Sequence, residues 1–236
     1  MNLTIVEGSP DELYEEVSPI VEECFSGIWT AADLQKLIEI THETRTFLVA
    51  YDGEKPIGYI YLVTDYVDDL DTTVATIQEL GILPKYRAPS IIEQLLSKTI
   101  AVAKEKKAKV LEQMVSSLDQ WTIPTLLQQQ FKPSEIKADR EISTLNEARL
   151  LVQNLKKNRK INVLVNQLIF ESEGEFDVQF LETESELDEL ARNDPIAFSS
   201  IISVDQDNSE STLTELKNLD IEWDEIGITF EYDLED

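Results

Sequence analysis

The chain has 236 residues, of which 42% are apolar, so it is long enough for one large or two small domains and apolar enough to bury a core. Its 47 acidic and 20 basic residues give a formal net charge of −27, which argues against direct binding to nucleic acid because phosphate contacts need clustered Lys and Arg. No apolar run approaches the roughly 18 residues that span a bilayer and no leader pattern is visible, so we expect no membrane contact and a cytoplasmic location.

The first 40 residues predict two helices. Apolar residues recur close to helical period over residues 11–25, and Cys24 falls on the apolar side, which favours a buried thiol over a nucleophile. A second helix is predicted from Thr30, whose hydroxyl can pair with the Asp33 carboxylate in a capping box. With one cysteine and one histidine, His42, the chain lacks the ligands of a structural zinc site, and we expect no metal.

Strands and helices alternate up to residue 170. A hairpin is predicted at residues 46–51 and 57–63, because β-branched and aromatic residues flank a turn that contains Gly53. Residues 74–83 predict a strand that ends against Pro84. The pattern then predicts helices at residues 90–107, 123–130 and 145–157, the last capped by Thr144 with Glu147, and strands at 110–116, 131–141 and 161–170.

Residues 171–236 are far more acidic than the rest of the chain. They hold 22 Asp or Glu against Arg192 and Lys217, a net of −20, whereas residues 1–170 hold 25 acids and 18 bases, a net of −7. Such a segment either improves solubility or adapts the protein to salt, the interpretation that we favour, or it attracts a basic protein or competes with DNA for one.

The acidic segment is nevertheless expected to be partly folded. Apolar residues alternate at 176–180 and at 226–232, which predicts strands, and Thr183 with Glu186 predicts the start of a short helix. We therefore divide the chain into a domain at residues 1–170 and an acidic extension at residues 171–236.

One segment carries a family resemblance. Residues 80–92 read Leu-Gly-Ile-Leu-Pro-Lys-Tyr-Arg-Ala-Pro-Ser-Ile-Ile, a strand end followed by Pro-x-Tyr-Arg and the start of a helix. This segment and the order of the predicted elements resemble the GNAT superfamily of acyl-CoA-dependent N-acyltransferases. The resemblance covers about residues 1–170. It implies a mixed α/β (α+β) fold, with a mostly antiparallel twisted sheet flanked by helices, here followed by the acidic α/β extension.

The resemblance implies acetyl-CoA as cofactor. In the family, backbone N–H groups at the helix start hold the pyrophosphate, and glycines let the backbone come close. Arg87 matches the first motif position, but Ser90 and Ile92 stand where small residues belong, and Pro89 supplies no N–H. Each departure weakens the implied anion site. That site would consist of Leu83, Lys85, Arg87, Ala88, Ser90, Ile91 and Ile92.

A second stretch, residues 119–131, resembles the family pattern Asn-x-x-Ala-x-x-Leu-Tyr-x-x-x-Gly-Phe. Leu126 falls at the tyrosine that often protonates the departing CoA thiolate in the family, and leucine has no proton to give. Asp119 falls at the asparagine, Thr122 at the alanine, Gln130 at the glycine and Phe131 at the phenylalanine.

Two further residues are candidates for an active site. Glu79 is the nearest candidate for a general base, although a glutamate near a strand end is often only exposed. Trp29 is a candidate for the lining of an amine-acceptor cleft, and the alternative is an aromatic residue of the core.

Two functions follow from the resemblance. In the first, the fold is a pseudoenzyme that has lost catalysis and binds or regulates a basic protein through residues 171–236. In the second, the chain is an active acetyl-CoA-dependent N-acetyltransferase acting on an unidentified amine. The lost glycines, the added proline and the missing acid favour the first, because fold alone does not settle function.

Overall fold

The computed structural model describes the following residues: 2–25, 29–40, 44–68, 71–117, 119, 121–158, 161–172, 175–181, 187, 195–204, 214–216, 218–219 and 221–235. His42 and most of the short helix predicted from Thr183 lie outside them. The chain forms two compact units. Unit 1 contains Met1–Met114, Trp121–Phe131 and Glu231–Asp236, and unit 2 contains Val115–Gln120 and Lys132–Phe230.

Unit 1 is built on strands in the order β1-β2-β3-β4-β5. Their bounds are β1 (Leu3–Gly8), β2 (Thr44–Asp52), β3 (Lys55–Val67), β4 (Thr72–Ile82) and β5 (Val110–Ser116). The first four strands pair antiparallel with their neighbours, and β5 pairs with β4 in parallel. The predicted hairpin is confirmed as β2 and β3, and Gly53 in its turn has φ +67°, in the left-handed region that glycine adopts without steric cost.

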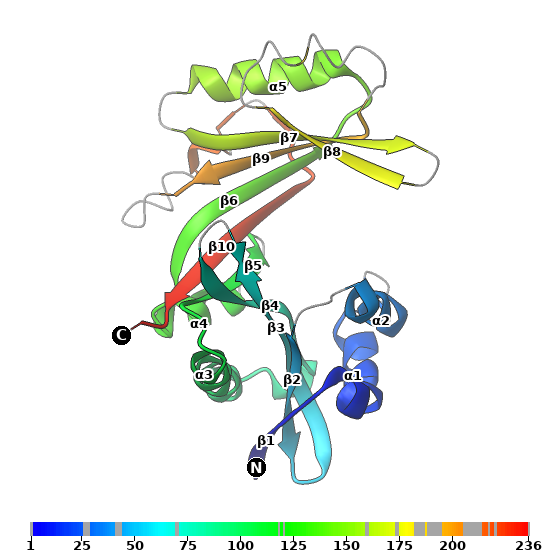
Figure 1. The fold of residues 1–236 in the computed structure, drawn as a ribbon, viewed down its shortest axis with the longest axis vertical. Coiled ribbons are helices and arrows are strands. Elements are labelled where there is room, and N and C mark those ends of the chain that lie inside the picture. Colours follow the sequence, from blue (N-terminus) through cyan, green and yellow to red (C-terminus); the bar gives the residue numbers. More distant parts are fainter. Residues whose placement is uncertain are drawn as a thin grey trace. The chain divides into compact units, whose positions relative to one another are not determined.

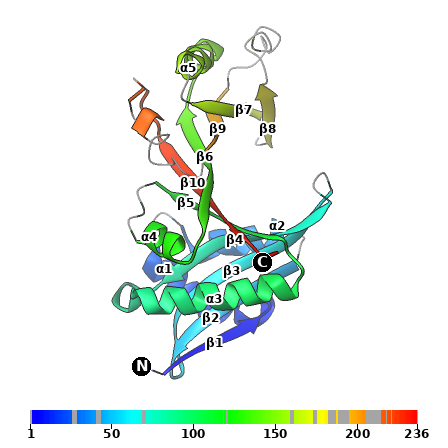
Figure 2. The same cartoon turned by 90° about the vertical axis from the view of Figure 1, so that its left-hand side faces the viewer.

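Helices cover both faces of this sheet, as Figures 1 and 2 show. α1 (Pro10–Cys24) and α2 (Ala31–Ile40) lie on one face, and α3 (Pro89–Glu105) lies on the other. The predicted capping box is present, because the Thr30 N–H and hydroxyl both donate to Asp33 Oδ2, at 3.1 and 2.7 Å. Burying each large apolar side chain between α1, α2 and the sheet contributes about 1.5–3 kcal/mol. This core includes Val17, Val21, Leu34, Phe47, Val49 and Tyr61.

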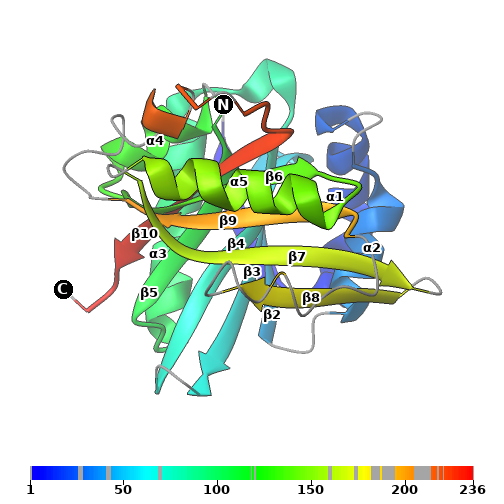
Figure 3. The same ribbon diagram turned by 90° about the horizontal axis from the view of Figure 1, so that it is seen from above.

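Unit 2 has its own run of strands, in the order β10-β6-β9-β7-β8. Their bounds are β6 (Lys132–Glu141), β7 (Asn162–Ser172), β8 (Glu175–Leu181), β9 (Ala197–Ser203) and β10 (Glu225–Asp233). β9 pairs antiparallel with β6 and β7, and β8 pairs antiparallel with β7. α5 (Leu145–Lys157) lies along these strands (Figure 3). Its predicted cap is present, because Thr144 Oγ1 accepts a hydrogen bond from the Glu147 N–H at 3.2 Å.

The structure confirms the predicted fold class, a mixed α/β protein with a large, mostly antiparallel sheet flanked by helices. Two strands, β1 and β9, were not expected from the sequence. Residues 170 and 171, between which the sequence places the domain boundary, lie inside β7, which pairs with β8 and β9, and the division of the chain there stays a prediction. No helix in the described part of the chain has the length and apolar character needed to cross a bilayer.

Candidate functional site

The centre of unit 1 has an irregularity in β4. Tyr61 pairs with Glu79 and Leu62 with Ile77, so Gln78 is an extra residue and forms a β-bulge. On its other edge β4 pairs with β5 only as far as Ile77 and Gln113. A bulge bends and twists a strand and often re-aims a side chain near a functional site. The end of β4 from residue 78 onward thus extends beyond its parallel ladder with β5, and Glu79 lies there.

Glu79 is held by Tyr59 on the neighbouring strand. Tyr59 lies opposite Gly81 in the β3–β4 register, and Gly81 is two residues from Glu79 along β4. The side chains of Tyr59 and Glu79 are therefore diagonal neighbours on the same face of the sheet. A Cβ atom at Gly81 would lie 2.6 Å from Tyr59 Cε1, so the glycine provides the room for the ring to lie across β4. The Tyr59 hydroxyl donates a hydrogen bond of 2.5 Å to Glu79 Oε2.

This environment changes the acidity of both groups. Burial raises the pKa of Glu79 to about 7, although the hydrogen bond from Tyr59 acts in the opposite direction. Burial and the neighbouring Glu79 carboxylate raise the pKa of Tyr59 well above its usual value, so the hydroxyl remains a donor. A carboxyl group that titrates near neutral pH has the acidity of an effective general base.

Cys24 and Arg87 adjoin this pair. Burial raises the pKa of Cys24 to about 11, and the nearby Arg87 offsets this only in part, so the thiol stays protonated at neutral pH. This agrees with a structural cysteine, which is partly buried at the end of α1. Arg87 Nε donates to the Ile82 carbonyl at 3.2 Å, and its guanidinium lies 5.8 Å from the centre of the Trp121 ring. The guanidinium is therefore already engaged within the chain.

The loop between β4 and α3 uses most of its own N–H groups. It contains the short 3₁₀ helix η2 (Pro84–Tyr86), and residues 83–91 span nine positions, all of them described. Pro84 and Pro89 have no N–H. The N–H groups of Lys85 and Ser90 have no hydrogen-bond acceptor among the described residues, apart from any bond inside a helix. The other five donate within the chain at 2.8–3.3 Å: Leu83 to Ile57, Tyr86 to Leu83, Arg87 to Pro84, Ala88 to Tyr86, and Ile91 to Ala88.

The side chains of the predicted cofactor residues divide into two groups. Ile91 and Ile92 are buried, at 1% and 0% exposure, so both side chains fill the core beneath α3. The Ile92 side chain is thus not the obstruction to a phosphate that the sequence suggested. Lys85, Arg87 and Ser90 are exposed. Lys85 lies 5.1 Å from the centre of the Tyr86 ring and near enough to Lys55 to lower the pKa of that lysine.

Trp29, the residue predicted for an acceptor cleft, packs partly buried against the core of α1, α2, β2 and β3. Its backbone N–H donates to the Phe25 carbonyl at 3.3 Å. The indole Nε1 is enclosed and has no hydrogen-bond partner among the described residues. This placement fits an aromatic residue of the core, and its role in a cleft stays a prediction.

The second motif stretch forms α4 (Thr122–Gln128) and its C-terminal cap. The Gln130 N–H donates to the Leu127 carbonyl and the Phe131 N–H to the Leu126 carbonyl, which is the Schellman arrangement. Gln130 has φ +68°, so a glutamine occupies the left-handed conformation that suits the glycine of the family pattern. Leu126 and Phe131 are buried, and the Phe131 ring lies 5.2 Å from that of Tyr232.

The structure thus brings together Glu79, Tyr59, Cys24 and Arg87, of which the sequence singled out Glu79 and Arg87. Tyr59 was missed, because only the strand register places it beside Glu79. The described residues contain no group of three or more His, Cys, Asp or Glu arranged to hold a metal ion.

Comparison with known proteins gives a family match and several similar structures. The model of the acetyltransferase (GNAT) family matches residues 14–124. The chain is similar to the PaiA N-acetyltransferase of Thermoplasma acidophilum in complex with coenzyme A, at 19% identity and a TM-score of 0.44, over 56% of this chain and 91% of that one. It is also similar to the ribosomal-protein-S18-alanine N-acetyltransferase of Escherichia coli, at 11% identity and a TM-score of 0.44, over 86% and 94% of the two chains. No curated protein matches the chain.

Proposed function

Because the chain belongs to the GNAT superfamily through residues 14–124, we propose that it keeps the acetyltransferase fold as a binding or regulatory module and has lost efficient catalysis. The observation that carries this proposal is the hydrogen bonding of residues 83–91. Five of these nine residues donate their N–H within the chain and two are proline, which leaves Lys85 and Ser90 as the two whose N–H has no acceptor among the described residues outside a regular helix.

A pyrophosphate at this loop would have to displace existing bonds. Phosphate oxygens are held at a helix start by several convergent N–H groups, and each intramolecular hydrogen bond given up costs about 0.5–1.5 kcal/mol. Arg87 would also have to leave the Ile82 carbonyl and the Trp121 ring. At the position of the family's acid, Leu126 offers no proton and is buried.

Thermal unfolding in the presence of acetyl-CoA tests the loss of the cofactor site. A ligand at 100 times its dissociation constant stabilises the native state by roughly 2.7 kcal/mol. We expect no rise in Tm for the full chain at about 2 mM acetyl-CoA. A clear, concentration-dependent rise would contradict the proposal.

In the same proposal, residues 171–236 provide the surface for a basic protein partner. Their net charge of −20 attracts cations, and this attraction fades beyond a Debye length of about 8 Å at physiological salt. Removing the segment would not be a clean test. It contains β8 and β9, and β9 pairs with both β6 and β7, so a deletion would disrupt unit 2.

Charge neutralisation avoids this problem. Glu222, Glu225 and Asp233 are exposed and lie in or beside β10, and the triple variant changes them to Gln, Gln and Asn. We expect it to bind labelled poly-lysine at least about threefold more weakly than wild type, with a salt-sensitive affinity. The matched control neutralises three exposed acids of residues 1–170: Glu15, Glu54 and Glu105. Equal loss of affinity in both variants would show that only net charge matters and would refute a binding surface at residues 171–236.

A second candidate function, acetyl transfer from acetyl-CoA to an amine, is favoured by Glu79. Its pKa of about 7 and its hydrogen bond to Tyr59 suit a general base that takes a proton from the attacking amine. The test is release of the CoA thiol with a panel of polyamines and peptide amines. Turnover in wild type that is lost in Glu79→Gln would support this function, and no turnover with any amine would count against it.

A further inference from the structure

β8 (Glu175–Leu181) is the outermost strand of unit 2 (Figure 3). It pairs antiparallel with β7 along its whole length, from Glu175 opposite Ser172 to Leu181 opposite Asn166. Among the described residues, no strand pairs with its other edge. Every second residue of a strand directs its N–H and C=O toward the same edge. This edge of β8 therefore presents backbone donors and acceptors to which another strand can be added.

Phe180 places an apolar side chain beside this edge. It is 64% exposed and lies opposite Gln167 of β7. The next residue, Leu181, is 3% exposed and lines a cavity together with residues of α5. Successive side chains of a strand point to opposite faces, so Phe180 lies on the face of the sheet away from α5. A strand added to β8 would bring its own side chains on that face into contact with Phe180.

The charge in and around β8 is of one sign. Residues 171–191 hold nine Asp or Glu and no Lys or Arg, and two of these acids, Glu175 and Asp177, belong to β8 itself. A second copy of β8 at this edge would bring acids close to acids, and like charges that face each other across two strands are destabilising. The edge therefore disfavours self-association and favours a strand that carries Lys or Arg.

We propose that this edge binds a basic protein by strand addition. An extended segment of the partner, in which Lys or Arg alternates with apolar residues, pairs with β8 and places an apolar side chain against Phe180. Main-chain hydrogen bonds then supply affinity, and the alternation matches the apolar face to Phe180 while the basic residues meet the surrounding acids. This inference rests on the proposed binding of a basic protein by residues 171–236, and adds where and in which conformation the partner is bound.

Two peptides of equal charge test whether the bound segment is a strand. A labelled peptide of about seven residues alternates Lys with Val, and its control carries the same residues with the lysines and valines in two blocks. Both are titrated with the full chain at about 0.15 M salt and followed by fluorescence anisotropy. We expect the alternating peptide to bind at least about fivefold more tightly. Equal affinity of the two peptides would overturn strand addition.

N-methylation tests the backbone pairing directly. Two versions of the alternating peptide carry N-methyl groups, one on the valines and the other on the lysines. Only one of these alternate sets of N–H groups can face β8. We expect one version to bind at least about tenfold more weakly than the unmethylated peptide and the other to bind within about twofold of it. Equal loss in both versions, or no loss in either, would overturn the pairing.

A variant at Phe180 locates the contact. Phe180→Ser should weaken the alternating peptide about three- to tenfold, because an apolar contact is lost. The matched control is Val6→Ser on β1, the outermost strand of unit 1, where Val6 is 43% exposed, and it should bind like wild type. Equal affinity of both variants would overturn the assignment to β8. If Phe180→Ser fails to fold, as judged by circular dichroism, the two N-methylated peptides decide.

Poly-lysine separates this inference from the proposed function. If wild type binds poly-lysine but does not prefer the alternating peptide to its block control, strand addition is overturned and the basic-partner surface of residues 171–236 stands. If wild type binds neither poly-lysine nor the peptides, both are overturned.

Discussion

At the scale of the residue, the acidity of Glu79 is set by burial and not by a charged partner. The carboxyl lies next to the bulge of β4 and accepts a hydrogen bond from the hydroxyl of Tyr59, whose ring lies across Gly81 and has room there because that residue has no Cβ. Its pKa of about 7 in the folded protein exceeds its ordinary value of 4.5. The native state therefore binds this proton more tightly than the unfolded chain does.

This linkage predicts a pH dependence of stability. Below pH 4.5 Glu79 is protonated in both the native and the unfolded state, so it does not lower the free energy of unfolding. As the pH rises from 4.5 to about 7, Glu79 ionises in the unfolded chain first, and the free energy of unfolding falls. Above about pH 7 the group is ionised in both states, and this loss of stability stays constant. Glu79→Gln keeps an acceptor for Tyr59 but cannot ionise. We expect it to be more stable than wild type by about 1–2 kcal/mol at pH 8, allowing for partial exposure, and close to wild type near pH 4.

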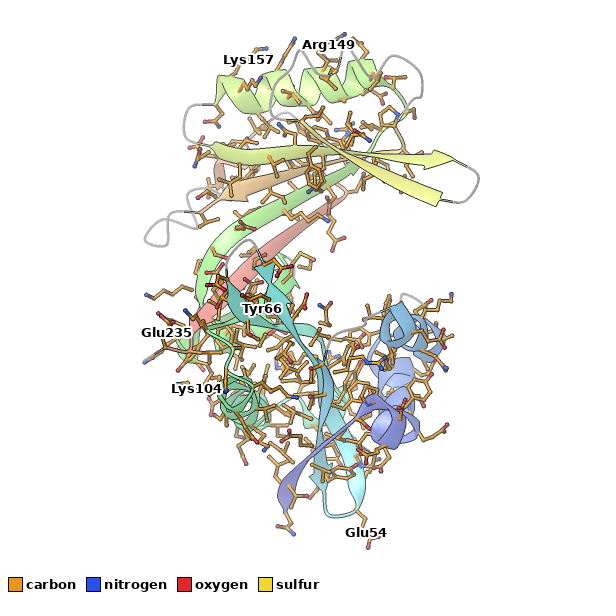
Figure 4. All side chains as sticks on the ribbon, viewed as in Figure 1. Glu54, Tyr66, Lys104, Arg149, Lys157 and Glu235 are labelled. Atoms are coloured by element: carbon orange, nitrogen blue, oxygen red, sulfur yellow. The ribbon has the colours of Figure 1, made fainter. Side chains whose placement is uncertain are left out.

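Urea unfolding across this pH range measures the effect. The matched control is Glu54→Gln, at the exposed turn between β2 and β3 (Figure 4), which should follow wild type at every pH. A constant difference between Glu79→Gln and wild type from pH 4 to pH 8 would show that the group titrates alike in both states.

The sequence alone identified Glu79 as a candidate base but not its acidity. The acidity depends on which residue of β3 lies diagonally opposite Glu79. The β3–β4 register fixes this neighbour, and that register joins residues distant in the sequence. The same holds for residues 83–91. The missing glycines and Pro89 are visible in the sequence, whereas the capture of five N–H groups by nearby carbonyls depends on the backbone path.

At the scale of the element, the end of α4 retains the backbone of the family pattern without its glycine. Both Schellman hydrogen bonds are made, and Gln130 takes the left-handed conformation between them. A left-handed conformation costs a residue with a Cβ roughly 1–2 kcal/mol, and glycine avoids this cost at the expense of entropy in the unfolded chain.

We therefore expect Gln130→Gly to raise the free energy of unfolding by about 0.5–1 kcal/mol. The adjacent Gln129 is the control, since its φ is −85° and glycine there adds only entropy to the unfolded chain. Gln129→Gly should lower the stability by about 0.5–1 kcal/mol. Chemical denaturation compares the two, and effects of the same sign would refute the assignment of strain to Gln130.

Elements with a strong local signal were predicted well, and two without one were missed. The capping box of α2, the Thr144 cap of α5 and the β2–β3 hairpin rest on residues close in sequence. β9 has no such signal, because Ser199 and Ser200 are adjacent and both fully buried between β6 and β7. Neither alternation nor a continuous apolar run marks a strand of this kind. β1 is short and its pattern is only half-buried.

At the scale of the whole molecule, a net charge of −27 opposes the folded state through self-repulsion. Screening should relieve it, because the Debye length falls from about 30 Å at 0.01 M salt to about 8 Å at 0.15 M. We expect Tm to rise by about 2–4 °C between these concentrations, and to rise less in the variant that neutralises Glu222, Glu225 and Asp233. Thermal unfolding at a series of NaCl and KCl concentrations measures the change in Tm. A Tm that stays constant or falls as either salt is added would contradict a destabilising self-repulsion.

The central claim is that the N–H groups after β4 no longer serve a pyrophosphate. The most direct test is a ¹H–¹⁵N correlation spectrum of the full chain titrated with acetyl-CoA, which reports each amide separately. We predict that the signals of Arg87, Ala88, Ser90 and Ile91 do not move up to about 2 mM cofactor. Saturable shifts at these four amides would show that the loop opens to bind the coenzyme and would contradict the account.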